Sequence, residues 1–112
     1  MGGEPLTEEN ITDVYILLSN IRKLYGDTKK IWLYTGLKLN IYNFIFISKG
    51  ISKDCNYHNT LLKTLELCDY VIDGEFIDDL KDRNLRFRGS SNQRIIDVKK
   101  TIMKKSLVII DD

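Results

Sequence analysis

The sequence predicts an α/β domain built on a parallel sheet, because two kinds of hydrophobic pattern alternate along the chain. Stripes with apolar residues three and four positions apart are typical of helices, and short continuous apolar runs are typical of buried strands. The order helix, strand, helix, strand favours right-handed β-α-β crossovers, which make neighbouring strands parallel. The length of 112 residues suits one domain, and we expect residues 1–112 to form it.

The first helix is predicted after the opening "MGGEPL". Thr7 is placed to cap its start, and Gly26 is placed to end it. Between them the apolar side chains recur at helical spacing and form one stripe: Ile11, Val14, Tyr15, Leu18, Ile21, Leu24 and Tyr25.

The first strand is predicted over residues 31–34, an apolar and aromatic run that ends before Gly36. A run without polar residues indicates a strand covered on both faces. Residues 37–59 fit either a helix or a strand. The need for a crossover favours a helix, whereas the aromatic and β-branched content favours a strand, and of the two we expect the helix.

The second half of the chain predicts four further elements and a loop. We predict a helix over residues 59–69, a strand over 70–73 and a short helical turn over 75–82. Residues 85–94 are expected to form a polar loop, and 106–110 a final strand. The apolar side of the 59–69 helix consists of Leu61, Leu62, Leu65 and Cys68.

Composition gives no reason to expect nucleic acid or membrane as a partner. Lys and Arg number 17 against 16 Asp and Glu, a net charge of +1. The basic cluster within 97–105 has no interleaved aromatic residue and is expected to be a solvated face. The opening residues lack the pattern of a signal peptide, and the most apolar run, 41–47, is too short to cross a bilayer. We therefore expect a cytoplasmic protein.

The cysteines predict no metal site. The chain has two, Cys55 and Cys68, and one histidine, His58. A closed zinc site needs four ligands, so free thiols in a reducing compartment are the expected state.

Glycine beside a polar residue recurs where strands are expected to end. The "GGEP" segment has the pattern of a turn after a strand, Thr35-Gly36 ends the first predicted strand, and Asp73-Gly74 ends the second. In an open α/β sheet, ligands bind beyond the carboxyl ends of the strands, so we expect a site at that edge. Taken singly, each pair is also explained by turn chemistry.

A polar loop near the C-terminus is the second candidate site. It consists of Arg88, Gly89, Ser90, Ser91, Asn92 and Gln93. The guanidinium, hydroxyl and amide groups suit the binding of a carboxylate, a peptide backbone or a nucleotide edge. The alternative, equally favoured by this chemistry, is a loop whose side chains bond its own backbone.

Four motifs in this order resemble the anaerobic ribonucleoside-triphosphate reductase activating proteins, a family of small radical S-adenosylmethionine enzymes. They are "GGEPL", "IWLYTG", "DYVIDGEFIDDLKD" and, most specifically, "LRFRGSSNQRIIDVKK". The resemblance implies a partial parallel (β/α) barrel and reductive cleavage of S-adenosylmethionine by a [4Fe-4S] cluster. The deoxyadenosyl radical that results takes hydrogen from a glycine of the anaerobic reductase, the expected partner.

The resemblance also implies roles for residues. Gly2, Gly3 and Glu4 are expected to receive the amino group of the cofactor's methionine portion. The full set expected to bind cofactor is Gly2, Gly3, Glu4, Pro5, Thr35 and Asp73. The 88–93 loop matches a family signature and is expected to contact cofactor or reductase.

One family motif is missing from the printed chain. The family carries C-x-x-x-C-x-x-C ahead of "GGEP", where three thiolates hold the cluster. Neither cysteine of this chain has that spacing. We therefore expect a C-terminal portion of an activating protein, truncated at its N-terminus, that holds no cluster, generates no radical alone and self-associates through an exposed sheet edge. The alternatives are a non-catalytic reductase-binding module or gene fragment and, less favoured, an α/β domain of unrelated function.

Overall fold

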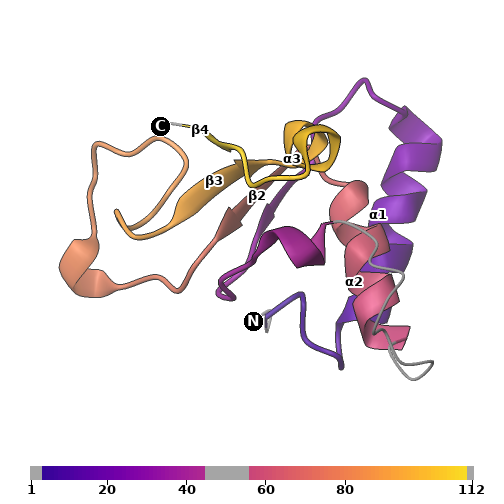
Figure 1. Cartoon of the computed structure of the whole chain (residues 1–112), viewed down its shortest axis with the longest axis horizontal. Helices are drawn as coiled ribbons and strands as arrows, with labels where there is room; N and C mark the ends of the chain where they lie inside the picture. The colour runs from indigo at the N-terminus through magenta and orange to yellow at the C-terminus, as the bar shows by residue number, and fades with distance from the viewer. Residues whose placement is uncertain (1–3, 45–55, 111–112) are drawn as a thin grey trace.

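The computed structural model describes residues 4–44 and 56–110, and these form a four-stranded sheet with helices packed against it (Figure 1). In chain order the elements are α1 (Ile11–Tyr25), β1 (Trp32–Tyr34), η1 (Ile41–Asn43, a 3₁₀ helix), α2 (Asn56–Glu66), β2 (Tyr70–Asp73), η2 (Asp78–Leu80, a 3₁₀ helix), β3 (Arg94–Asp97), α3 (Val98–Lys104) and β4 (Ile109–Ile110). The strand order is β1-β2-β3-β4. The prediction of an α/β class is confirmed.

The sheet is mixed rather than parallel. β1 and β2 run parallel, with Leu33 opposite Val71, as predicted. β3 is antiparallel to β2, with Arg94 opposite Asp73, and β4 is antiparallel to β3. The prediction of a wholly parallel sheet is therefore wrong for its second half. The reason is the connection between β2 and β3. Residues 74–93 contain no α-helix that would carry the chain back to the start of β2, so β3 begins beside the carboxyl end of β2 and runs antiparallel to it (Figure 1).

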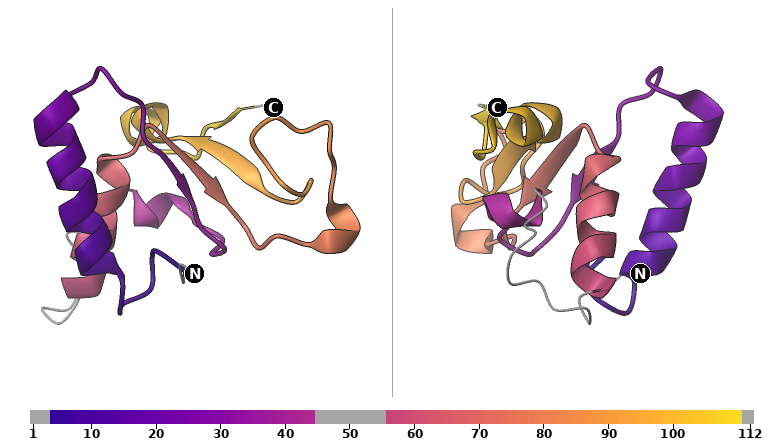
Figure 2. Two further views of the ribbon diagram at one scale, coloured as in Figure 1. Left: turned by 180° about the vertical axis from the view of Figure 1, so that it is seen from behind. Right: turned by 45° about the vertical axis from the view of Figure 1, so that its right-hand side comes forward.

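One face of the sheet forms the main core. Leu33, Val71 and Ile96 on that face pack against α1 and α2, which lie side by side (Figure 2). The buried side chains that meet them are Leu6, Ile11, Leu18, Leu61, Leu65 and Cys68. Each fully buried Leu or Ile stabilises the fold by about 2 kcal/mol relative to an exposed one. This face is therefore the main source of stability.

The opposite face is covered by a loop instead of a helix. The ring of Trp32 stacks on Phe87 with centroids 4.7 Å apart, and the centroid of the tilted Tyr70 ring is 4.4 Å from that of Trp32. Tyr34 donates its hydroxyl proton to the Phe87 carbonyl at 2.6 Å but stays 51% exposed. The expectation that β1 is covered on both faces is thus wrong, because segment 74–93 covers this face only in part.

The first helix ends where the sequence predicts but starts later. Gly26 ends α1 with a left-handed φ of 55°, which confirms its predicted role. α1 begins at Ile11 with Asn10 at its N-cap position, so Thr7 is not the N-cap, although its hydroxyl accepts from the Asn10 N–H at 3.3 Å. Thr7 lies one turn earlier, where its carbonyl accepts from the N–H groups of Asn10 and Ile11.

The remaining predictions have mixed outcomes. Of the helix expected over 37–59, the described part holds only the 3₁₀ turn η1 and the start of α2, and residues 45–55 lie outside the described residues. α2 confirms the helix predicted from residue 59, although it begins three residues earlier. η2 and β4 confirm the helical turn and the last strand, whereas β3 was not predicted. Within the described ranges 4–44 and 56–110, no helix has the length and apolar character needed to cross a membrane.

Candidate functional site

The carboxyl ends of β1 and β2 meet at one edge of the sheet, as the strand-end pattern predicts. Thr35 and Gly36 follow β1 beside the point where Asp73 ends β2. The Gly74 N–H donates to the Leu37 carbonyl at 3.0 Å and joins the two ends. We call the residues gathered here the carboxyl edge: Glu4, Thr35, Gly36, Leu39, Asp73 and Arg94.

Three donors hold the Glu4 carboxylate at the end of β1. Oε2 accepts from the Thr35 hydroxyl at 2.6 Å and from the Leu6 N–H at 2.9 Å. Oε1 accepts from the Gly36 N–H at 2.6 Å. A Cβ atom on Gly36 would lie 3.4 Å from Oε1, so glycine keeps the space beside this oxygen open. Short hydrogen bonds to an ionised group are the strong kind, and they fix the charge in place.

The turn around Glu4 is also held by the helices. The Glu4 carbonyl accepts from Asn10 Nδ2 at 2.9 Å, and Tyr57 of α2 donates its hydroxyl proton to the Leu6 carbonyl at 2.5 Å. Burial raises the pKa of Tyr57, and the charges of Glu4 and Glu8 raise it further, so the phenol remains a donor. The segment before α1 is thus tied to β1, α1 and α2.

The described contacts do not test the expected role of three predicted cofactor residues, Gly2, Gly3 and Pro5. Gly2 and Gly3 are outside the described residues. Pro5 lies within the turn that brings the Leu6 N–H back to Glu4. The role expected for these three residues stays a prediction.

Asp73 is fully buried and paired with Arg94, the first residue of β3. Arg94 Nε donates to Oδ1 at 2.9 Å and Nη2 donates to Oδ2 at 2.5 Å. Oδ2 also accepts from the Leu39 N–H at 2.8 Å, and the Leu39 carbonyl accepts from Arg94 at 2.7 Å. The hydrogen bonds with Asp73 raise the pKa of Arg94. With 0% of Asp73 exposed, these contacts make it an anchor for the 35–40 loop, and its expected contact with cofactor stays a prediction.

The 88–93 loop bonds chiefly to itself and to the end of β2. The Gln93 side-chain oxygen accepts from the N–H groups of Gly89 and Ser90, and its amide donates to the Gly74 carbonyl at 3.0 Å. Asn92 donates to the Glu75 carbonyl at 2.7 Å. The remaining members follow the same pattern: Arg88 donates to the Gln93 carbonyl, and the Ser91 N–H donates to the Leu80 carbonyl. These are the contacts of the self-bonding alternative, and contact with cofactor or reductase stays a prediction.

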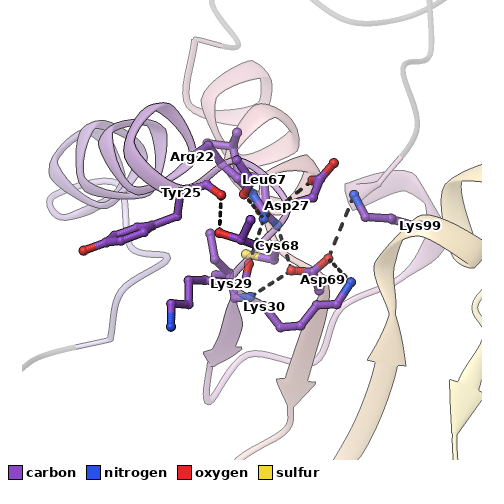
Figure 3. Close-up of polar contacts among 12 residues, drawn as sticks. Arg22, Tyr25, Asp27, Lys29, Lys30, Leu67, Cys68, Asp69 and Lys99 are labelled. Atoms are coloured by element: carbon purple, nitrogen blue, oxygen red, sulfur yellow. Dashed lines mark hydrogen bonds and ion pairs between the residues drawn. The ribbon is translucent and has the colours of Figure 1, made fainter.

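The opposite end of β2 carries a second buried carboxylate, Asp69 (Figure 3). Its Oδ2 accepts from Arg22 Nη2 and from the Ile31 N–H, both at 2.8 Å. Lys30 and Lys99 place their ammonium groups 3.9 Å from Oδ1. Burial acts to raise the pKa of Asp69, but the Ile31 hydrogen bond and the Arg22 guanidinium outweigh burial and lower it.

Sequence reasoning missed the partners of both buried aspartates. A buried carboxylate requires a cation, so Asp69 and Asp73 each imply one. Nothing in the spacing singles out Arg22 or Arg94 among the arginines, because each pair joins distant segments of the chain. Among the described residues no enclosed pocket is found.

Sequence comparison first gives the class of protein. The model of the 4Fe-4S single cluster domain family matches residues 1–96. The chain belongs to this family.

Particular relatives then define the resemblance more closely: they are anaerobic ribonucleoside-triphosphate reductase-activating proteins. The protein of this name from Escherichia coli K12 is 35% identical over 92 residues, 82% of this chain and 49% of the relative. The Salmonella typhimurium protein is 34% identical over the same shares, and the Vibrio cholerae protein is 30% identical over 84% of this chain and 50% of the relative. The resemblance seen in the motifs is confirmed. The chain spans about half the length of the curated relatives it matches, and no solved structure matches it significantly.

The residues of this chain do not fit a [4Fe-4S] cluster. Such a cluster is held by cysteine thiolates, and the chain has two cysteines. Burial raises the pKa of Cys68 to about 12, so its thiol stays protonated. Cys55 lies outside the described residues, and within the described ones no group of three His, Cys, Asp or Glu is arranged to hold a metal ion. No chemical step is therefore assigned to a cluster on these residues.

Proposed function

We propose that this chain is the part of an anaerobic ribonucleoside-triphosphate reductase-activating protein that binds the methionine end of S-adenosylmethionine and faces the reductase. Homology over 82% of the chain supports the assignment. The observation that carries the proposal is the Glu4 carboxylate, held by three donors beyond the carboxyl ends of two parallel strands.

The carboxylate fits the ammonium group of a methionine moiety. A carboxylate offers about four lone-pair positions, and three of those on Glu4 are filled. The fourth is on Oε1, where no described residue donates, and the missing side chain of Gly36 leaves room there for a ligand. In this proposal Gly2, Gly3 and Pro5 shape the turn around the same ammonium group.

Two other residues of the carboxyl edge support this contact indirectly. Thr35 and Asp73 bond protein groups and support the 35–40 loop. When bound beside a reduced cluster, S-adenosylmethionine supplies the radical chemistry that leaves a glycyl radical on the reductase. The proposal assigns to this chain the binding and orientation of its methionine end.

The architecture around the site agrees with this role. We regard β1, α2 and β2 as part of a partial (β/α) barrel of a cytoplasmic activating protein. The packing of α1 and α2 on a single face of the sheet supports this arrangement. Segment 74–93 leaves the carboxyl edge and carries the exposed side chains of Phe76, Ile77 and Leu80, which supports a reductase-facing position.

A second function is a reductase-binding module without chemistry. The observation that favours it is the cysteine content, which provides neither the number nor the spacing needed for a cluster. The two functions differ in whether radical chemistry appears once a cluster-bearing segment is joined to this chain.

Electron paramagnetic resonance of the reductase tests the proposal. The purified chain is mixed anaerobically with the reductase, S-adenosylmethionine and dithionite, alone and as a fusion behind a segment that carries the family's C-x-x-x-C-x-x-C motif. We expect no glycyl radical with the chain alone and a glycyl radical with the fusion. Reductase binding without a radical in the fusion would favour the binding module. Neither binding nor a radical would overturn the proposal.

A further inference from the structure

The two oxygens of the Glu4 carboxylate are not equivalent. Among residues 4–44 and 56–110, Oε2 has two donors, the Thr35 hydroxyl and the Leu6 N–H, and Oε1 has one, the Gly36 N–H. With two lone pairs per oxygen, the donors of the described residues fill Oε2 and leave one position of Oε1 open. The Thr35 hydroxyl, together with the Leu6 N–H, therefore sets the direction from which a cation can bind this carboxylate.

Thr35 has no proton left to donate to a ligand. Its hydroxyl gives its single proton to Glu4 and accepts from the Leu37 N–H at 3.1 Å. One lone pair of the hydroxyl remains, but the residue is only 4% exposed, so a ligand has little access to it. Any effect of Thr35 on a bound ligand must therefore pass through Glu4.

We propose that Thr35 is a positioning residue, which fills Oε2 of Glu4 and so directs a primary ammonium group to Oε1. This inference rests on the proposed function, because the ammonium group is that of the methionine moiety. Without the Thr35 hydroxyl, Oε2 has a free lone pair and the carboxylate loses one of the two contacts that hold it to the end of β1. The ammonium group then meets a carboxylate of less defined orientation.

Two ligands and three variants test the proposal on the full chain. Thr35→Val removes the hydroxyl at nearly constant volume, and Thr35→Ser keeps it. Thr64→Val is the matched control, because Thr64 is also a buried threonine and its hydroxyl bonds the Thr60 carbonyl within α2, away from Glu4. The ligands are S-adenosylmethionine and 5′-methylthioadenosine, which lacks the ammonium group. Affinities are measured by calorimetry.

We expect Thr35→Val to weaken binding of S-adenosylmethionine about tenfold, the effect of one hydrogen bond to a charged group. Binding of 5′-methylthioadenosine should change less than twofold, and Thr35→Ser and Thr64→Val should resemble the wild type with both ligands. A purely structural role for Thr35 would weaken both ligands equally, and this result would overturn the proposal.

A measurement on the unmodified chain covers the case in which Thr35→Val does not fold. Amide resonances are followed by nuclear magnetic resonance during titration with S-adenosylmethionine. The Gly36 N–H, bonded to Oε1, should shift strongly, while the Leu6 N–H, bonded to Oε2, should shift little. Equal shifts, or a larger shift at Leu6, would overturn the positioning role alone. Absence of binding by either ligand would overturn the proposed function itself.

Discussion

The two ends of β2 are built alike, yet they serve different parts of the molecule. Asp69 precedes the strand and Asp73 ends it, and each is buried, paired with one arginine and bonded to one backbone N–H. Each arginine also reaches a backbone carbonyl, Leu67 for Arg22 and Leu39 for Arg94. The chemistry of the two pairs is therefore nearly the same.

The difference lies in what surrounds each pair. The Asp69 pair joins α1 to the sheet and has Lys30 and Lys99 nearby (Figure 3). The Asp73 pair holds the 35–40 loop, whose first residues bind the Glu4 carboxylate. A buried ion pair alone thus does not identify a site. Its position relative to the strand direction does, because ligands bind beyond the carboxyl ends of parallel strands.

The largest expected effect is that of Asp73→Asn. It leaves the Arg94 cation without its carboxylate, and removing one partner of a buried pair costs about 3 kcal/mol or more. Urea denaturation measures the loss. Asp79→Asn, at an exposed residue, is the control and should cost less than about 0.5 kcal/mol. Equal losses in both variants would show that Arg94 needs no partner.

Asp69→Asn should cost less, about 2 kcal/mol, because Arg22 keeps its hydrogen bonds to the Leu67, Gly26 and Lys29 carbonyls. The pKa of Asp69 is lowered in the folded protein, so its contribution to stability is present above the unfolded carboxyl pKa of about 3.9 and is lost as pH falls through the folded value. Stability curves against pH should therefore show a smaller loss below about pH 4 in Asp69→Asn than in the wild type. Parallel curves would contradict the lowered pKa.

Replacing each arginine by lysine should affect only the end of β2 at which that arginine lies. Lysine replaces the arginine fork with a single ammonium group, so each change should cost about 1 kcal/mol. Arg94→Lys should speed hydrogen exchange at the Leu39 amide, and Arg22→Lys at the Ile31 amide, as followed by nuclear magnetic resonance. Cross-effects at the distant amide would mean that the ends are coupled.

The smallest expected effect is that of Gly89→Ala, in segment 74–93, which follows the carboxyl edge. A Cβ atom on Gly89 would lie 2.9 Å from Cδ2 of Phe76, but the Phe76 ring is half-exposed and free to turn outward. Gly89→Ala should therefore change the unfolding free energy by about 0.5 kcal/mol or less. A loss above about 2 kcal/mol in thermal denaturation would show that this packing is rigid.

The sequence predicted the features that depend on local pattern. α1, α2, β1 and β2 have strong apolar periodicity or short apolar runs, and the parallel pairing of β1 with β2 follows from the helix between them. The gathering of Glu4, Thr35 and Asp73 at one edge followed from the strand ends. The antiparallel β3 did not, because residues 74–93 give no local sign of returning to the edge that they left.

The sequence alone also did not predict the tertiary contacts that decide the role of each residue. Thr35 and Asp73 were chosen as ligand-binding residues for their polar groups, yet both bond protein groups. Whether a polar side chain faces a ligand or the protein depends on its tertiary neighbours. The Asp73–Arg94 pair arises only when two strands meet.

Hydrogen–deuterium exchange of the chain with and without S-adenosylmethionine tests most directly whether the carboxyl edge is the functional end. We predict slower exchange over residues 4–6 and 36–39 in the presence of S-adenosylmethionine, and unchanged exchange over 29–31 and 67–70. Protection at the Asp69 end, or none at either end, would contradict this conclusion.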